Sequence, residues 1–251
     1  MNSVKKIGKV LLSLSGVVAI WWLFALSDAV NPQLFPTPLA VWEAALELHQ
    51  EGLLYSDLNV SLERAAIGFF TGSLLGIVIG LLTAQTRFFR FALNPFLTLL
   101  RPIPAIALVP VAIVWFGIGE PSKYFVISYT VFLAVWLNTH HGMEHIATTY
   151  LRAARSLGAS RTREFFEVVI PAAAPHIVAG LRMGAALAFL ALVAAELTGS
   201  SSGIGFRLQE ARQFIRTDRM FVGLIELGIL GALLDFIFVT MSRKIVHWEH
   251  L

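Results

Sequence analysis

Long apolar runs separated by shorter polar segments dominate the pattern of the chain. A helix needs about 20 mostly apolar residues to cross the hydrocarbon core of a bilayer, and six runs approach or reach that length. They are residues 10–27, 65–84, 102–119, 124–143, 172–195 and 220–241. The pattern predicts an all-α polytopic membrane bundle of six transmembrane helices, forming one domain over residues 1–251.

The first run follows Lys5, Lys6 and Lys9, a pattern that a cleaved signal peptide also has. The run is longer than the apolar region of a typical signal peptide, and its tryptophan pair, Trp21 and Trp22, suits a membrane interface. We therefore expect the run to be a retained membrane helix.

Four glycines recur at every fourth position of the second run, at Gly68, Gly72, Gly76 and Gly80. This spacing places all four on one helix face, where another backbone can approach closely. The pattern predicts tight helix packing, either within the chain or across a dimer interface.

The third run contains Pro102, Pro104 and Pro110. Each proline removes a backbone donor from the helix. Irregular backbone at membrane depth is tolerated beside protein or a water-filled cavity. We therefore expect the third run to form a wall of a translocation path.

The composition supports a membrane protein, because 57% of residues are hydrophobic and only 14% are charged. A soluble domain carries about 25% charged residues. The net charge of +3 and pI near 9.4 would suit a nucleic-acid partner. The basic residues instead cluster beside the apolar runs, so no nucleic acid is expected. The absence of cysteine excludes disulfides, zinc–thiolate sites and cysteine nucleophiles.

The positive residues favour one orientation. With a cytoplasmic N-terminus, the inner segments hold 11 Lys and Arg residues and the outer segments hold five. Both termini are then cytoplasmic. Outside, residues 36–50 start with a proline and are expected to form a helix along the membrane surface. The outer loop 196–219 is expected to start flexibly and then form a short amphipathic helix.

Ionisable residues in or near the predicted spans have two readings. They are Arg101, Arg182, Glu196, Glu226 and Asp235. Such residues line a polar path, where an arginine attracts an anion, or they form structural ion pairs. Arg182 with Glu226 or Asp235 is an example of the second reading. The candidates for a substrate path are Arg101, Pro104, Asn138, Arg182 and Glu196.

No enzyme motif is present in the sequence. The segment GIGEPSK lacks the second glycine that a phosphate-binding loop requires, and there is no HExxH motif. His140, His141 and His145 have no further ligand at a suitable spacing, so no metal site is expected. Any energy source for transport must therefore be another chain or an ion gradient.

The loop at about 144–171 carries a specific signal. Arg152-Ala153-Ala154, three residues, Gly158, nine residues and then Val168-x-Ile170-Pro171 follow the spacing E-A-A-x3-G-x9-I-x-L-P. This is the cytoplasmic motif of ABC importer permeases, with arginine at the first position here. Pro171 is expected to end the loop and to start the fifth span.

The resemblance to ABC importer permeases implies that this loop couples the chain to an ATPase. It implies a coupling helix with the residues Arg152, Ala153, Ala154, Leu157, Gly158, Ser160 and Pro171. Further segments, among them SLGASR, IPAAAP and VAAEL, make nearly the whole chain similar to the permeases for aliphatic sulfonates and taurine. Nitrate, bicarbonate and thiamine-precursor permeases are close relatives of that group.

The family implies a type I importer permease in the bacterial inner membrane. It forms a homodimer with two ATP-binding subunits and receives its substrate from an extracytoplasmic solute-binding protein. ATP and magnesium are bound by the partner ATPase, and this chain has no cofactor and no catalytic residues. The expected substrate is a small organic anion such as a sulfonate or taurine. The alternatives are nitrate or bicarbonate, a thiamine-precursor pyrimidine, and a carrier driven by an ion gradient, which would need paired broken helices.

Overall fold

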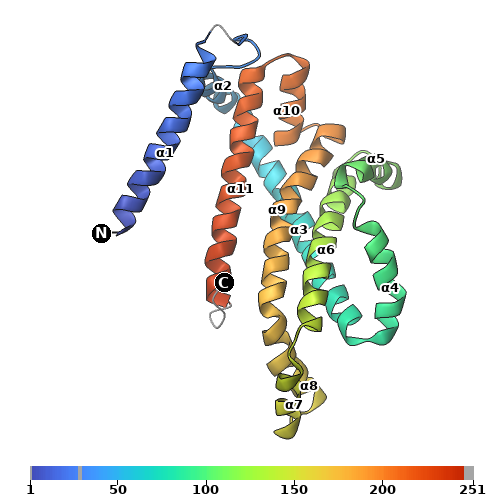
Figure 1. Ribbon diagram of the computed structural model, residues 1–251. Coiled ribbons are helices and arrows are strands. Elements are labelled where there is room, and N and C mark those ends of the chain that lie inside the picture. Colours follow the sequence, from blue (N-terminus) through green and yellow to red (C-terminus); the bar gives the residue numbers. More distant parts are fainter. Residues whose placement is uncertain (1, 28–29, 246–251) are drawn as a thin grey trace. The chain divides into compact units, whose positions relative to one another are not determined.

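The computed structural model describes residues 2–27 and 30–245, and these residues form helices and short links without a strand (Figure 1). In chain order the helices are α1 Asn2–Ala25, α2 Pro38–Gln50, α3 Leu53–Gln85, α4 Arg87–Leu100, α5 Ala105–Phe116, α6 Glu120–Glu144, α7 Thr148–Ser156, α8 Arg161–Glu164, a π-helical turn Phe165–Val169, α9 Ile170–Gly199, α10 Ile204–Gln213 and α11 Thr217–Ile245. The all-α prediction is confirmed for this part of the chain. The predicted side of the two chain ends concerns residues 1 and 246–251, which lie outside the described residues.

Three helical segments within the described ranges are long and apolar enough to cross a membrane. They are Leu53–Gln85, Arg161–Gly199 and Thr217–Thr240, which contain the second and fifth predicted spans and all but the last residue of the sixth. The helices α4 and α5 form a bent pair that would count as a fourth. The prediction of a polytopic helical membrane protein is confirmed, and the count of six stays a prediction.

The third predicted span, residues 102–119, is corrected by the structure. The helix α5 covers only Ala105–Phe116, and it follows α4 at an angle of 107°. The physical cause lies in the link Arg101-Pro102-Ile103-Pro104, because each proline removes a donor and restricts the residue before it. The hydroxyl of Tyr129 on α6 donates a hydrogen bond of 2.8 Å to the carbonyl of Leu100 and holds the bend.

The chain divides into two compact units, residues 1–60 with 202–228 and residues 61–201 with 229–251. In the first unit, the predicted helix is present as α2, but it begins at Pro38, two residues after the predicted start, because the Thr37 hydroxyl accepts a hydrogen bond from the Ala40 amide and caps it. Its buried face, Val41, Ala44 and Leu48, packs against Val222 and the partly buried Trp21 and Phe221. The predicted helix after residue 205 is α10.

The second unit is built on close contact between α3 and α6. A Cβ atom added at Gly76 would lie 2.8 Å from the Val135 Cβ and 2.9 Å from the Phe132 carbonyl oxygen. A Cβ atom added at Gly80 would lie 2.6 Å from the Thr139 Cβ atom. Real Cβ atoms do not approach so closely, so only glycine permits this contact. Of the two readings of the glycine pattern, packing within the chain is the one that the structure contains.

The helix α9 packs on α6 through further small residues. A Cβ atom added at Gly180 would lie 2.7 Å from the Asn138 Cβ atom. A Cβ atom added at Gly184 would lie 3.2 Å from the Val131 Cγ1 atom. The core of the second unit contains Val131 and Val135 of α6 together with Ala188, Ala191, Leu192 and Ala195 of α9. This close contact fixes the helix that leaves the predicted coupling loop.

Candidate functional site

The predicted coupling loop folds as a short helix closed by a glycine turn. The amide of Gly158 donates to the Arg155 carbonyl at 3.0 Å, and the amide of Ala159 donates to the Ala154 carbonyl at 3.0 Å. This pair of bonds is a Schellman motif, whose turn residue takes the left-handed conformation. Gly158 has a φ of 80°, so the expected turn is present at this glycine.

The turn exposes a large apolar side chain. Leu157 is 88% exposed and caps the end of α7, while Ala154 is buried on the inner side of the same helix. Arg152 and Ala153 are exposed on the outer side. The motif residues therefore form one outward surface, with Ala154 tying the helix to the rest of the loop.

An ion pair closes the loop on itself. The Arg155 guanidinium donates two hydrogen bonds to the Glu164 carboxylate, at 2.7 and 2.8 Å, and so joins α7 to α8. These bonds raise the pKa of Arg155. The Ser160 hydroxyl accepts a hydrogen bond from the Arg163 amide at 3.3 Å and caps α8. Both contacts restrict the motion of the turn.

Pro171 lies in the first turn of α9, as expected, but it does not end the preceding segment. The helical segment already begins at Arg161 and runs to Gly199 through the π-helical turn Phe165–Val169. The amide of Ile170 bonds to the carbonyl of Phe165, five residues back. This wider turn lets the chain pass Pro171, which has no amide hydrogen to donate, without ending the helix.

A cavity of about 830 Å³ lies inside the loop. Arg155, Glu164 and Phe165 line it together with Glu144 and Leu151. Both charged and apolar side chains line the cavity, and it lies within the second unit. The outward surface at Leu157 is not part of its wall.

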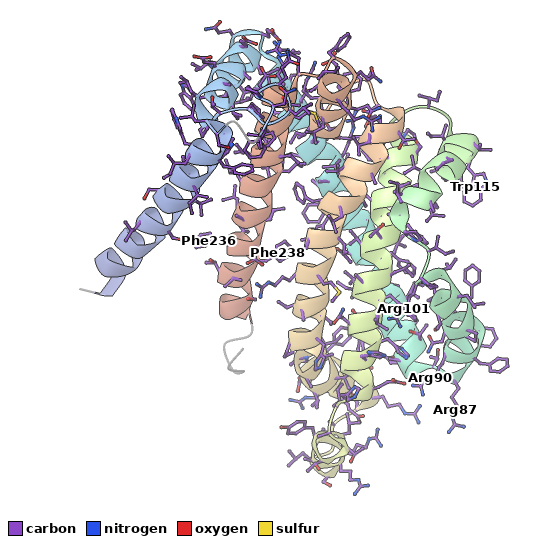
Figure 2. All side chains as sticks on the ribbon, turned by 45° about the horizontal axis from the view of Figure 1, so that its top comes forward. Arg87, Arg90, Arg101, Trp115, Phe236 and Phe238 are labelled. Atoms are coloured by element: carbon purple, nitrogen blue, oxygen red, sulfur yellow. The ribbon has the colours of Figure 1, made fainter. Side chains whose placement is uncertain are left out.

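The candidate substrate-path residues separate into three places. Arg101 and Pro104 line a cavity of about 460 Å³ beside the bend between α4 and α5. Figure 2 shows Arg101 at this bend, and Arg87 and Arg90 at the start of α4. Asn138 does not line the cavity, but its amide donates to the carbonyl of Ala134, which does. Arg101 is the one charged residue among those that the structure places in this wall.

Arg182 lies elsewhere, in an ion pair with Asp235 of α11. The Arg182 Nε and Nη2 atoms each lie 2.8 Å from Asp235 Oδ1, and both side chains are about half exposed. They line a separate cavity of about 150 Å³. This is one of the two structural pairings considered for Arg182, and its effect on a substrate path stays a prediction.

Glu196 is fully buried in a cluster that the sequence did not reveal. The Arg64 guanidinium donates to Glu196 at 2.8 Å and binds Glu120 through two bonds of 2.7 Å. The Ser61 hydroxyl donates to the same Glu196 carboxylate at 2.8 Å, and Lys123 lies 3.0 Å from Glu120. Glu196 therefore lies in a charge-balanced cluster, apart from the cavity that holds Arg101.

The histidine cluster also has a structural arrangement. The ring of His140 is buried and lies 3.0 Å from the Thr83 hydroxyl and 3.2 Å from the Asn94 amide nitrogen. His145 ends α6 and bonds to the carbonyl of His141. Among the described residues, no group of three or more potential metal ligands comes together.

A family model described as "Binding-protein-dependent transport system inner membrane component" matches residues 72–247. The putative aliphatic sulfonates transport permease protein SsuC of Bacillus subtilis (strain 168) is 36% identical over 234 residues, which cover 93% of this chain and 85% of that protein. The taurine transport system permease protein TauC of Escherichia coli (strain K12) is 33% identical, over 94% of this chain and 88% of its own length. The nitrate import permease protein NrtB of Synechocystis is 31% identical, over 95% and 89%.

The fold has a counterpart among solved structures. The inward-facing MetNI methionine ABC transporter matches with a TM-score of 0.66 over 77% of this chain and 95% of the other, at 20% identity. At that identity the likeness concerns the fold alone. The permease fold expected from the loop motif is therefore the fold that these helices adopt.

Proposed function

Because the chain belongs to the family of binding-protein-dependent transport system inner membrane components, we propose that it works as a homodimer bound to two ATPase subunits and imports a small organic anion. The chain is a multi-pass permease subunit of an ABC importer and is itself non-catalytic. In the proposed complex, ATP and magnesium bind to the partner ATPase. The solute-binding protein delivers the substrate on the other side of the membrane.

The turn at Leu157 and Gly158 carries the proposal that α7 docks on the ATPase. Leu157 is 88% exposed, and burying it under another protein would contribute about 1.5–3 kcal/mol to docking. The Arg155–Glu164 bonds hold the turn in one shape, so little conformational entropy is lost on docking. With α7 in the cytoplasm and six spans, both termini are expected in the cytoplasm and the protein in the bacterial inner membrane.

Arg101 supports an anionic substrate. Its side chain is the charged member of an otherwise mostly apolar wall, and a guanidinium binds oxyanions through a rigid fork of donors. A sulfonate or taurine fits this chemistry and agrees with the names of the relatives SsuC and TauC. Nitrate and bicarbonate fit the same guanidinium, whereas an uncharged pyrimidine gains nothing from it.

Co-purification with the ATPase tests the docking. We expect the tagged chain and its ATPase to elute as a two-plus-two complex that hydrolyses ATP. Gly158→Trp should release the ATPase, because the bulky side chain stands on the docking surface. Gly52→Trp is the matched control: Gly52 also has a positive φ, 73°, and open space around it, so the backbone strain is similar. If both variants retain the ATPase equally, the docking assignment is wrong.

Uptake into proteoliposomes tests the substrate. We expect taurine or alkanesulfonate uptake that falls at least about tenfold in Arg101→Gln, since a lost charge-assisted bond costs about 1.5–3 kcal/mol, and falls less in Arg101→Lys, which keeps the charge but lacks the fork of donors. Competition by nitrate and bicarbonate ranks the anions. Uptake of a neutral pyrimidine that is insensitive to Arg101→Gln would overturn the anion assignment and leave the permease role intact.

A further inference from the structure

The turn after α10 has an unusual residue at its centre. The amide of Ile215 donates to the Arg212 carbonyl at 3.3 Å, and the amide of Arg216 donates to the Ala211 carbonyl at 2.8 Å. These two bonds form a Schellman motif, with Ile215 at the left-handed position and a φ of 54°. Glycine usually takes this position, and a β-branched side chain there is a clear outlier.

The Schellman turn after α7 has glycine, the usual residue, at the left-handed position. Gly158 supplies the left-handed residue after α7, with the same pattern of hydrogen bonds. Ile215 is 66% exposed and its neighbour Phe214 is 72% exposed, so neither side chain is held there by burial in its own chain. Strained residues mark functional sites when the surrounding structure holds them in place.

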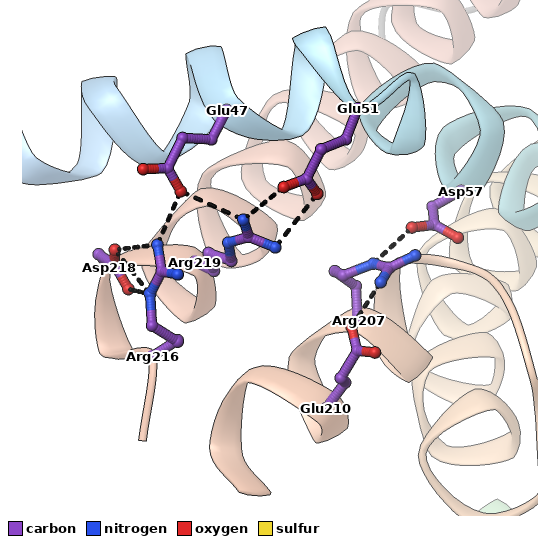
Figure 3. A network of polar contacts seen from close by, with 8 residues as sticks. All are labelled: Glu47, Glu51, Asp57, Arg207, Glu210, Arg216, Asp218 and Arg219. Carbon is purple, nitrogen blue, oxygen red and sulfur yellow. Dashed lines mark hydrogen bonds and ion pairs between the residues drawn. The ribbon is translucent and has the colours of Figure 1, made fainter. Parts of the chain in front are cut away.

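Ion pairs supply that support for the turn. Arg216 binds Glu47 of α2 at 2.8 Å and Asp218 at 2.8 Å, and Arg219 binds Glu51 at 2.8 Å and Glu47 at 3.1 Å (Figure 3). Hydrogen bonds from Arg216 and then from Arg219 lower the pKa of Glu47. The residue that follows the strained isoleucine is therefore fixed to a neighbouring helix, and the two apolar side chains project from a rigid base.

The surroundings of the turn define the partner chemistry. The side chain of Arg212 is exposed and makes no ion pair among the described residues. A cavity of about 550 Å³ adjoins the turn, with Phe214 and Arg216 in its wall. A complementary partner has an apolar hollow for the two side chains and carboxylates around it. The polar neighbours Arg212, Gln213 and Arg216 make hydrocarbon a poor environment for the same turn.

The side of the membrane identifies the partner. The helical segment from Arg161 to Gly199 has 39 residues, about 58 Å of helix, which exceeds the roughly 30 Å of hydrocarbon. The chain therefore leaves α9 on the membrane face opposite to α7. It returns through α11, whose spanning segment begins at Thr217. The turn at Ile215 lies between these two spans, on the face where the solute-binding protein arrives.

We propose that Phe214 and Ile215 form an apolar contact through which the solute-binding protein docks on the permease. This inference rests on the proposed function, because it takes α7 as the ATPase side. The strained turn presents both side chains outward, and Arg212 pairs with a carboxylate of the binding protein. Neither Phe214 nor Ile215 lines the cavity beside Arg101.

The experiment measures binding of the fluorescently labelled solute-binding protein to the complete transporter in nanodiscs. We expect Phe214→Ala and Ile215→Gly each to raise the dissociation constant by about tenfold or more, as truncation of a central apolar contact does in other interfaces. Basal ATP hydrolysis should be unchanged. Ile215→Gly removes the strain, so a folding defect cannot explain its loss of binding. Leu34→Ala is the matched control, because Leu34 is a similarly exposed apolar residue of the same unit.

Three outcomes count against the inference. Unchanged dissociation constants in both variants, with normal binding by the wild-type complex, overturn the docking contact and leave the proposed function standing. An effect that appears only as a changed dependence on lipid composition shows that the turn is a membrane contact instead. A wild-type complex that assembles with its ATPase but never binds the solute-binding protein overturns both proposals.

Discussion

Removing the buried carboxylate of Glu196 should strongly destabilise the chain. The side chain of Arg64 is 2% exposed and binds Glu196 on one side and Glu120 on the other. Two unit charges about 4 Å apart interact by about 4 kcal/mol at an effective dielectric constant of about 20. Glu196→Gln keeps the shape but removes the charge, and we expect the free energy of unfolding to fall by about 3–5 kcal/mol.

The same arginine supplies an internal comparison. Glu120 makes the shorter bonds to Arg64, but its side chain is 44% exposed, so solvent screens its charge. We expect Glu120→Gln to cost only about 1 kcal/mol, although distance alone would rank it first. The double variant Arg64→Met with Glu196→Leu removes both buried partners, and it should be less destabilised than the sum of its single changes by about 2 kcal/mol.

Unfolding in mixed micelles, followed by the fluorescence of the native tryptophans, measures all five variants: Glu196→Gln, Glu120→Gln, the double variant, and its two single changes Arg64→Met and Glu196→Leu. Each curve gives a free energy if unfolding is reversible and the slope with denaturant is unchanged. Equal losses in Glu196→Gln and Glu120→Gln would show that burial does not decide the strength of these pairs. A double variant whose loss is the plain sum would refute the coupling between Arg64 and Glu196.

Three further predictions concern other parts of the chain. Hydrogen bonds from Arg216, and then from Arg219, hold the pKa of Glu47 below its ordinary value of 4.5. The stability that the Glu47 carboxylate contributes is therefore present above pH 4.5 and is lost as the pH falls through the folded-state pKa. Glu47→Gln should abolish this part of the acid dependence in a thermal melt. Gly76→Ala should destabilise by about 1–3 kcal/mol through overpacking, whereas Gly228→Ala, with open space around it, should be neutral or slightly stabilising in the same assay. Arg182→Ala should lower substrate uptake through its lost pairing, and wild-type uptake would remove Arg182 from the path and from the packing.

The sequence predicted features that local spacing determines. Four glycines at every fourth position must share a helix face, and Gly76 and Gly80 do meet α6 as closely as this pattern requires. The turn at Gly158 follows from the loop motif and has the positive φ that glycine allows. The docking role of the loop is not decided by its shape and stays a prediction.

Features that depend on three-dimensional geometry escaped prediction. Arg64 and Glu196 are 132 positions apart, and no spacing rule connects them. An arginine beside an apolar run needs a carboxylate partner, and this rule predicts that Arg64 is paired. Several carboxylates were available, and only the packing of the helices selects among them. Asp235 was one of two partners considered for Arg182, and the structure contains that pair.

The bend between α4 and α5 shows a third kind of limit. Hydropathy averages over a window, so the run was counted as one span, although its three prolines predicted an irregular backbone. Arg87 and Arg90 were counted as part of a cytoplasmic segment. In the structure both belong to the helix α4, Arg87–Leu100. A proline pair predicts an interruption, but the 107° angle depends on contacts such as that of Tyr129 with the Leu100 carbonyl.

One continuous helix connects the two ends of the proposed mechanism. The Arg155–Glu164 pair attaches the coupling turn to the segment that begins at Arg161, and the same segment ends near the buried Glu196. A helix transmits displacement along its axis because its backbone hydrogen bonds are continuous, and Gly180 sits so close to α6 that sideways movement is resisted. The π-helical turn is the one place where this segment departs from regular helix. If an ATPase moves the turn at Gly158, the displacement therefore passes through the π-helical turn into α9, and the Arg64–Glu196 contact at the far end must either move with it or break.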